Sequence, residues 1–78
     1  MKLENYILYY KDDCPYCKRV LRFMEKNNIT CEMKDTSIEA IQEELIKIGG
    51  KKQVPCLVKD KQVMYESMDI IQHLNSLL

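Results

Sequence analysis

The feature that most limits the fold of this chain is a pair of cysteines, Cys14 and Cys17, placed between two regular patterns. The segment before the pair, NYILYY at 5–10, has aromatic and β-branched residues at both odd and even positions, which is typical of a strand covered on both faces. After Cys14, Pro15 suits the first position of a helix, and apolar residues then recur at helical spacing until Asn27. The pair is therefore predicted to lie where a central strand turns into an amphipathic helix.

The next segments predict a second strand and a second helix. Residues 29–34 alternate weakly between apolar and polar, and a strand here would run parallel to the first because a helix separates the two. Thr36 followed by Glu39 has the spacing of a capping box, which predicts a helix that ends at Gly49 and Gly50. The inner face of this helix is predicted to carry four apolar residues, Ile38, Ile41, Leu45 and Ile48.

The last third of the chain predicts a β-hairpin and a third helix. The segments 54–59 and 61–66 are short strands, close enough in sequence to pair. Ser67 is predicted to cap the final helix. The inner face of that helix is predicted to carry Ile70, Ile71, Leu74 and Leu77. The resulting order is β-α-β-α-β-β-α, and the compact arrangement for it is an α/β fold with a four-stranded mixed sheet flanked by three helices.

The size and charge of the chain limit the range of functions that it can have. A length of 78 residues gives room for one small domain, predicted to span residues 1–78. The 12 acidic and 12 basic residues cancel, so no overall field draws the protein to nucleic acid or to a membrane. The longest apolar run, YILYY, is far shorter than the roughly 20 residues that span a bilayer, and residues 1–20 lack the pattern of a secretory signal. We therefore expect a cytoplasmic protein with reduced cysteines and with no nucleic-acid or membrane partner.

The position of the cysteine pair predicts its chemistry. The free N–H groups and the dipole at the start of a helix favour negative charge, so they stabilise a thiolate at Cys14. Lys11, Lys18 and Arg19 add positive charge nearby. Cys17 lies one helical turn further on, close enough to form a disulfide with Cys14. Cys14 is thus predicted to attack a disulfide, and Cys17 to resolve the mixed disulfide that forms.

A zinc site and a structural disulfide are the alternative uses of the pair. Zinc usually takes four ligands, whereas Cys31, Cys56 and His73 are single residues in separate predicted elements. A structural bridge is uncommon in a reducing compartment, and this one would close a very short loop. Both alternatives are less favoured than a reactive pair, and no metal site is predicted. Cys56 is expected to be a core residue, because it follows Pro55 on a strand whose side chains alternate between faces.

Four segments together resemble the glutaredoxins, a branch of the thioredoxin-fold family, over nearly the whole chain. They are YYK before CPYC, GGKKQVP before the third strand, the short hairpin after it, and YESMDI at the start of the last helix. The resemblance implies a thioredoxin-like (glutaredoxin) fold with a cis peptide bond before Pro55. It also implies a thiol–disulfide oxidoreductase of electron transport and cell redox homeostasis, with glutathione as co-substrate and no bound cofactor.

The same resemblance implies which residues meet glutathione. Lys11 and Tyr16 would flank it at the cysteine pair, and Gln53 would lie close to it. The backbone of Val54 would bond to its cysteinyl peptide group, and Pro55 would pack on the disulfide. The implied partners are glutathione and disulfide-bonded or glutathionylated proteins, and the protein is expected to be a monomer.

The start of the last helix departs from the glutaredoxin pattern. Many glutaredoxins have a segment similar to Gly-Gly-Cys/Ser-Asp at the positions where this chain has Tyr65-Glu66-Ser67-Met68. The Glu-Ser pair is instead similar to that of glutathione transferase N-terminal domains. Ser67 and the free N–H groups of the helix can hold the γ-glutamyl carboxylate of glutathione, while Glu66 can meet its ammonium group.

The sequence alone leaves three other functions open. One is a thioredoxin-like reductase that a flavoprotein, not glutathione, recharges. Another is an iron–sulfur carrier in which Cys14 from two subunits and two glutathiones hold a cluster. Pro15 and the second cysteine count against the carrier, because motifs resembling this one usually favour dithiol redox work. A binding module with an unreactive pair is a further alternative.

Overall fold

The computed structural model describes residues 1–78, and its elements follow the predicted order β-α-β-α-β-β-α. In chain order they are β1 (Lys2–Tyr10), α1 (Pro15–Lys26), β2 (Thr30–Asp35), α2 (Glu39–Gly49), β3 (Cys56–Lys59), β4 (Gln62–Met64) and α3 (Ser67–Ser76). None of the three helices is long and apolar enough to cross a membrane.

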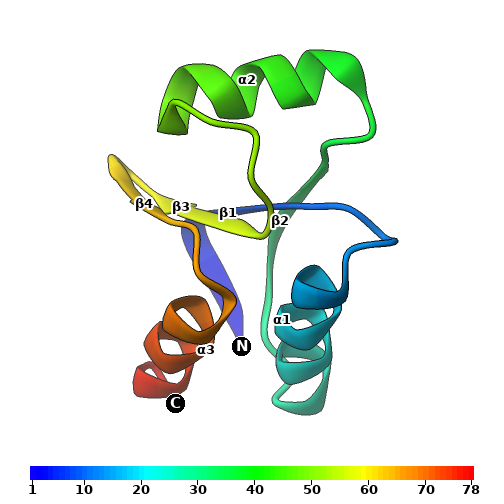
Figure 1. Cartoon of the computed structure of the whole chain (residues 1–78). Coiled ribbons are helices and arrows are strands. Elements are labelled where there is room, and N and C mark those ends of the chain that lie inside the picture. The colour runs from blue at the N-terminus through cyan, green and yellow to red at the C-terminus, as the bar shows by residue number, and fades with distance from the viewer.

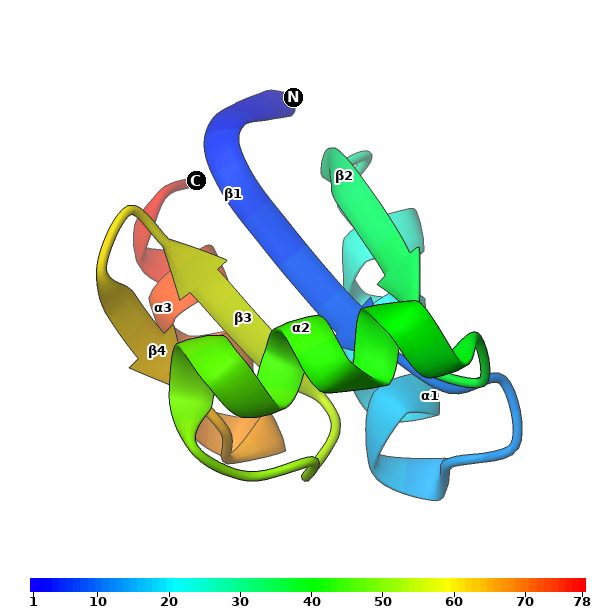
Figure 2. The ribbon, with the colours of Figure 1, turned by 90° about the horizontal axis from the view of Figure 1, so that it is seen from above.

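The strands form one mixed sheet in the order β2-β1-β3-β4. β1 pairs parallel with β2 and antiparallel with β3, and β3 and β4 form an antiparallel hairpin. Figure 2 shows this order from above, with β1 between β2 and β3. The hairpin turn lacks glycine, and Asp60 takes the left-handed conformation there with φ 53°. The predicted central position of the first strand and the predicted hairpin are both confirmed.

Helices cover both faces of the sheet. In Figure 1, α2 lies above the sheet, and α1 and α3 lie side by side beneath it. Leu8 and Tyr9, neighbours on β1, are both fully buried because successive side chains of a strand point to opposite faces. The larger core lies under the sheet and contains Tyr6, Leu8, Val20, Met24, Ile29, Leu57, Ile70 and Leu74. The smaller core, on the side of α2, contains Tyr9, Leu45, Cys56 and Val58.

The start of α2 differs from the prediction. The helix begins after Ile38, and no side chain caps it. Thr36 is buried instead, and both its N–H group and its hydroxyl donate to the carbonyl oxygen of Tyr10, at 2.9 and 3.2 Å. The predicted capping box is therefore wrong, because Thr36 joins the ends of β1 and β2. The predicted end is confirmed, since Gly50 follows the helix in the left-handed conformation with φ 84°.

The predicted inner face of α2 is only partly buried. Leu45 is fully buried and Ile41 is half-buried, whereas Ile38 and Ile48 are 54% and 44% exposed. Ile38 precedes the helix, and the smaller core reaches only Ile41 and Leu45 in its middle. The prediction that all four residues face the core is wrong, because Ile38 lies before the helix and, near the helix end, Gly49 and not Ile48 packs inward, against the Tyr65 ring.

The start of α3 is one residue away from its predicted position. Glu66 occupies the N-cap position without a side-chain cap, and Ser67 is the first helical residue, so the predicted cap at Ser67 is wrong. The predicted inner face holds for Ile70 and Leu74, which are fully buried, and for Ile71, which is half-buried against the larger core. Leu77 lies just beyond the helix and is 37% exposed. The shift leaves Ser67 buried at the first turn, where the backbone N–H groups of a helix have no partner within it.

Candidate functional site

Cys14 lies at the corner between β1 and α1, as predicted. It is the N-cap residue of α1, with an extended backbone, and Pro15 follows as the first helical residue. The Cys14 sulfur accepts a hydrogen bond from the N–H group of Cys17 at 3.4 Å. This contact and the helix dipole both favour negative charge on that sulfur. Cys14 is half-buried, whereas Cys17 behind it is enclosed.

Cys17 differs from Cys14 in its surroundings. Its side chain is fully buried, and burial is the main cause that raises the pKa of its thiol to about 12. It therefore keeps its proton near neutral pH. Neither cysteine is in a disulfide. The structure thus holds one half-buried cysteine and one enclosed thiol, a turn apart on the same helix.

The segment before β3 lies against the cysteine pair. The Val54–Pro55 peptide bond is cis, as the resemblance implied. The thiol of Cys14 donates to the carbonyl oxygen of Val54 over a distance of 3.8 Å. Two parts of the chain that are 40 residues apart are joined by this contact.

A groove of about 440 Å³ lies beside this contact, and three segments line it. From α1 come Tyr16 and Arg19, from the loop before β3 come Gln53, Val54 and Pro55, and from the start of α3 come Tyr65, Glu66, Ser67 and Met68. The groove brings together most of the residues that the resemblance implied for glutathione, namely Tyr16, Gln53, Val54, Pro55, Glu66 and Ser67.

Lys11 does not line this groove. Its side chain is half-buried and its charge acts on Asp35, a residue at the end of β2. The pKa of the Asp35 carboxyl lies below its ordinary value, first because Ser37 donates hydrogen bonds to it and to a smaller extent because of Lys11. The implied contact of Lys11 with glutathione is therefore not supported by the groove.

The start of α3 suits a ligand that carries both charges. Ser67 is buried at the first helical position, where free N–H groups and the helix dipole favour an anion. Glu66 precedes it, is exposed and lines the same groove. A carboxylate and an ammonium group on one ligand can therefore be bound by neighbouring residues.

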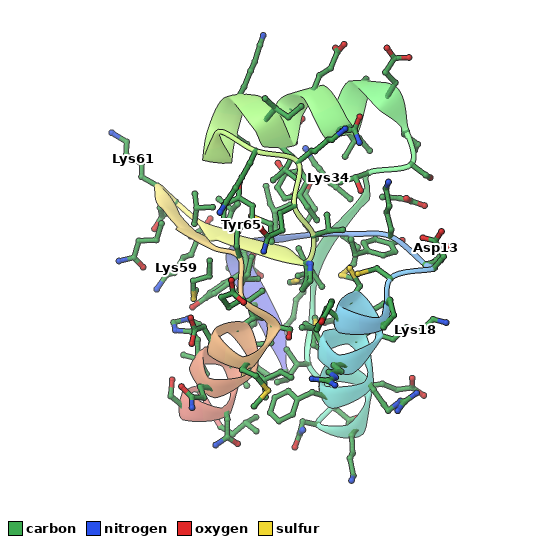
Figure 3. All side chains as sticks on the ribbon, viewed as in Figure 1. Asp13, Lys18, Lys34, Lys59, Lys61 and Tyr65 are labelled. Atoms are coloured by element: carbon green, nitrogen blue, oxygen red, sulfur yellow. The ribbon has the colours of Figure 1, made fainter.

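Tyr65 links this turn to the loop that follows α2. Its hydroxyl donates to the carbonyl oxygen of Lys51 at 3.0 Å, and the Lys51 ammonium lies 4.5 Å from the centre of its ring. Gly49 is packed against the ring so closely that a Cβ atom there would lie 1.8 Å from the Tyr65 oxygen. Figure 3 shows Tyr65 between the sheet and the end of α2. Tyr65 thus ties the start of α3 to the loop before β3, which are two of the three segments that line the groove.

Three residues of the groove were not predicted as site residues, namely Arg19, Tyr65 and Met68. A signal for Arg19 was present, since it follows Tyr16 by three positions and so shares its face of α1. Its guanidinium carbon lies 5.6 Å from the centre of the Tyr16 ring. Tyr65 and Met68 adjoin the predicted Glu66–Ser67 pair, but no local pattern shows that they reach the same groove.

The remaining cysteines and the histidine lie elsewhere. Cys56 is buried on the α2 side of the sheet, as predicted, and burial is the main cause that raises the pKa of its thiol to about 11. Cys31 is half-buried on β2, and burial likewise raises the pKa of its thiol. His73 lies 2.9 Å from the hydroxyl oxygen of Tyr6. No three His, Cys, Asp or Glu side chains are placed to share a metal ion.

The sheet, the three helices and the cis proline beside a helix-capping cysteine define a protein of the thioredoxin-like fold. The chain matches the family described as "Glutathione S-transferase, N-terminal domain" over residues 8–77. Because this match covers most of the chain, the chain belongs to that family. The similarity that the Glu66–Ser67 pair suggested is thereby confirmed at the level of the family, while the dithiol glutaredoxin type stays a prediction.

Comparisons with individual proteins agree with this fold. The chain is 34% identical over 62 residues to the glutathione S-transferase DHAR3, chloroplastic, of Arabidopsis thaliana, with 80% of this chain covered. It superposes with a TM-score of 0.79 on glutathione transferase Omega 3C from Trametes versicolor, at 22% identity and over 96% of this chain. A glutaredoxin from Archaeoglobus fulgidus superposes over 90% of this chain with a TM-score of 0.68 at 22% identity.

The relatives differ from this chain in length. It spans 24% of the Arabidopsis protein and 34% of the Trametes transferase, but 85% of the Archaeoglobus glutaredoxin. The similarity to the transferases is therefore confined to one part of those proteins. The fold is common to the transferases and the glutaredoxin.

Proposed function

We propose that this protein is a glutathione-dependent thiol–disulfide oxidoreductase of the glutaredoxin type, with Cys14 as nucleophile and Cys17 as resolving thiol. One observation carries the proposal: the Cys14 sulfur caps α1, 3.4 Å from the N–H group of Cys17, and meets the Val54 carbonyl at the edge of the groove. A thiolate that a helix start stabilises beside a peptide-sized groove is suited to disulfide exchange.

The proposed reaction with a glutathionylated protein has two exchange steps. The Cys14 thiolate attacks the sulfur of the bound glutathione, a disulfide forms between them, and the protein leaves as a thiolate that takes up a proton. The thiolate of a second glutathione then attacks the mixed disulfide. Oxidised glutathione leaves and the Cys14 thiolate is restored, so the sulfur of the second glutathione is oxidised to a disulfide and the protein sulfur is reduced to a thiol.

Reduction of a protein disulfide uses Cys17 as well. Cys14 first forms a mixed disulfide with the protein, and Cys17 then loses its proton and attacks the Cys14 sulfur. The protein leaves with both thiols reduced, and two glutathiones reduce the Cys14–Cys17 disulfide. Since burial raises the pKa of Cys17 to about 12, a base from solvent or the leaving thiolate has to take its proton.

Glutathione is proposed to bind along the loop before β3 and the start of α3. The Ser67 hydroxyl and the free N–H groups of α3 hold the γ-glutamyl carboxylate, and Glu66 meets the ammonium group. The Val54 backbone bonds to the cysteinyl peptide group, and Pro55 packs against the sulfur atoms. Gln53 borders the same part of the groove. Tyr16 borders it from α1, whereas Lys11 lies outside the groove and is left out of this set.

The proposal is tested with a glutathionylated peptide and a peptide disulfide as substrates and glutathione as reductant. Cys14→Ser is expected to lose turnover of both, because a serine hydroxyl is not ionised near neutral pH. Cys17→Ser is expected to keep turnover of the glutathionylated peptide and to lose most turnover of the peptide disulfide. Substantial turnover by Cys14→Ser contradicts the proposal. Turnover that depends on a flavoprotein reductase and not on glutathione supports the thioredoxin-like rival instead.

A second candidate function is transfer of glutathione to an electrophile, which the family match favours. In that reaction the glutathione sulfur attacks a carbon centre, and Cys14 is not oxidised. Conjugation of glutathione to 1-chloro-2,4-dinitrobenzene separates the two functions. Conjugation that persists in Cys14→Ser, with no turnover of the glutathionylated peptide by the unchanged protein, favours the transferase.

A further inference from the structure

Three residues that line the groove, Tyr16 and Arg19 on α1 and Met68 on α3, are here called the α1–α3 wall. Of these, only Tyr16 is among the proposed glutathione contacts, and Arg19 and Met68 are not used by them. Tyr16 and Met68 are 58% and 56% exposed, which is high for large apolar side chains. Exposed apolar side chains that line a groove are typical of a surface that binds a ligand or partner.

Arg19 gives this wall an unpaired positive charge. Both ion pairs of the structure belong to Lys34, so Arg19 has no acidic partner within the protein. The Tyr16 ring lies close to its guanidinium, at 5.6 Å, a distance at which a ring attracts a cation. Arg19 and Glu66 are the two charged residues that line the groove. Glu66 is assigned to the ammonium of glutathione and Ser67 to its γ-glutamyl carboxylate, so Arg19 is available for a further carboxylate. The glycyl carboxylate of glutathione is the same in every glutathionylated substrate, so a carboxylate on the polypeptide is the one by which Arg19 can distinguish substrates.

A disulfide substrate has two halves, and both have to lie close to Cys14. In a glutathionylated protein, one half is glutathione, which is assigned to the loop before β3 and the start of α3. The other half is the protein segment around the modified cysteine. The α1–α3 wall is the part of the groove that is left for it. The apolar surface of Met68 is flexible enough to pack against varied side chains.

From this placement, which rests on the proposed function, we infer that the α1–α3 wall binds the polypeptide half of a glutathionylated substrate. Arg19 acts there as a specificity-determining residue. It selects segments that carry an Asp or Glu close to the modified cysteine. The planar guanidinium, with its five N–H donors, suits a carboxylate.

Lys18 supplies a matched control for Arg19. The two residues adjoin on α1 and carry the same charge, but Lys18 does not line the groove. Figure 3 shows Lys18 extending from α1 on the side away from α3. Lys18→Gln and Arg19→Gln therefore change the net charge equally, and only Arg19→Gln changes the wall. Both residues are exposed, so neither substitution threatens the fold.

The test uses two glutathionylated peptides, with glutathione as reductant. The peptides are identical except for the residue two positions from the cysteine, which is Glu in one and Gln in the other. For the unchanged protein, kcat/KM is expected to be about three- to fivefold higher for the Glu peptide, as for an exposed ion pair at low salt. In Arg19→Gln the ratio is expected to fall to about one, and in Lys18→Gln to stay as in the unchanged protein. The preference is expected to shrink in about 1 M salt.

Two results overturn the inference while the proposed function stands. One is equal turnover of both peptides by the unchanged protein. The other is an equal loss of preference in Lys18→Gln and Arg19→Gln, which assigns the effect to the general field around α1. If the unchanged protein turns over neither peptide, the proposed function itself fails.

Discussion

At the scale of single residues, two identical side chains have different surroundings. Cys14 is half-buried and its sulfur accepts an N–H hydrogen bond, whereas burial raises the pKa of the Cys17 thiol. Cys31 and Cys56 also have pKa values raised mainly by burial. In the proposed reaction, these surroundings favour Cys14 as the attacking thiol and the cysteine one turn further along α1 as the resolving thiol.

The assignment of Ser67 to glutathione leads to a prediction about affinity. Ser67→Ala removes a hydroxyl that is proposed to donate to a carboxylate, and hydrogen bonds to charged groups contribute about 1.5–3 kcal/mol. The KM for glutathione is therefore expected to rise about tenfold or more, while the rate with saturating glutathione changes less. Steady-state kinetics at varied glutathione concentration measure both quantities.

Ser76→Ala is the control for this substitution. Ser76 lies at the other end of α3, is exposed, and its hydroxyl donates to the carbonyl of His73. Its substitution is expected to leave the KM for glutathione unchanged. An unchanged KM in Ser67→Ala, or an equal rise in both variants, contradicts the proposed binding of the γ-glutamyl carboxylate at the start of α3.

The residues whose position in the fold could be predicted from the sequence are those with a local signal. Cys14 and Cys17 stand out by their spacing and by their position between a strand and a helix. Arg19 and Met68 have no comparable signal, because the groove forms only when three distant segments meet. The position of Lys11 outside the groove was not predictable for the same reason.

At the scale of elements, local signals competed with contacts between strands. The spacing of Thr36 and Glu39 indicates a capping box, yet Thr36 bonds to the Tyr10 carbonyl and the helix starts later. A capping hydroxyl bonds to its own helix, but Thr36 joins two strand ends, and this pairing cannot be deduced from local spacing. The starts of α1 and α3 lie within one residue of their predicted positions, since no such competing contact is present at Pro15 or Ser67.

The contact between α2 and the turn before α3 leads to a prediction about stability. A methyl group at Gly49 would overlap the Tyr65 hydroxyl, so Gly49→Ala forces the tyrosine away from Lys51. Overpacking of this kind typically costs about 1–3 kcal/mol. The free energy of unfolding of Gly49→Ala is expected to fall by this amount, and denaturant unfolding measures it.

A double-mutant cycle separates this contact from any general effect of residue 49. In a Tyr65→Ala background the overlap is absent, and alanine is a better helix former than glycine. Gly49→Ala is then expected to be neutral or slightly stabilising. The same loss of stability in both backgrounds would show that Tyr65 is not the cause.

At the scale of the whole molecule, the fold was predictable because few arrangements fit the order of elements. A helix between the first two strands makes them parallel, and a short turn between the last two makes them antiparallel. These rules place NYILYY in the middle of the sheet, where β1 lies between β2 and β3. The rules do not say where α2 begins or which residue of its last turn packs inward, so the exposure of Ile38 and Ile48 was not predicted.

The proposed site lies within the part of the chain common to the longer relatives. All residues that line the groove fall between Tyr16 and Met68, and the family match covers residues 8–77. The proposed contacts to glutathione thus need no residue from the parts of the transferases that this chain does not span. We therefore expect the 78-residue chain alone to form a mixed disulfide with glutathione.

The measurement that tests the role of Cys14 most directly is the position of that mixed disulfide. Cys17→Ser, which cannot resolve it, is incubated with oxidised glutathione near neutral pH and then mapped by mass spectrometry. One glutathione on Cys14 is predicted, with Cys31 and Cys56 unmodified. Modification of the half-buried Cys31 in place of Cys14, or no modification at all, would contradict the proposed function.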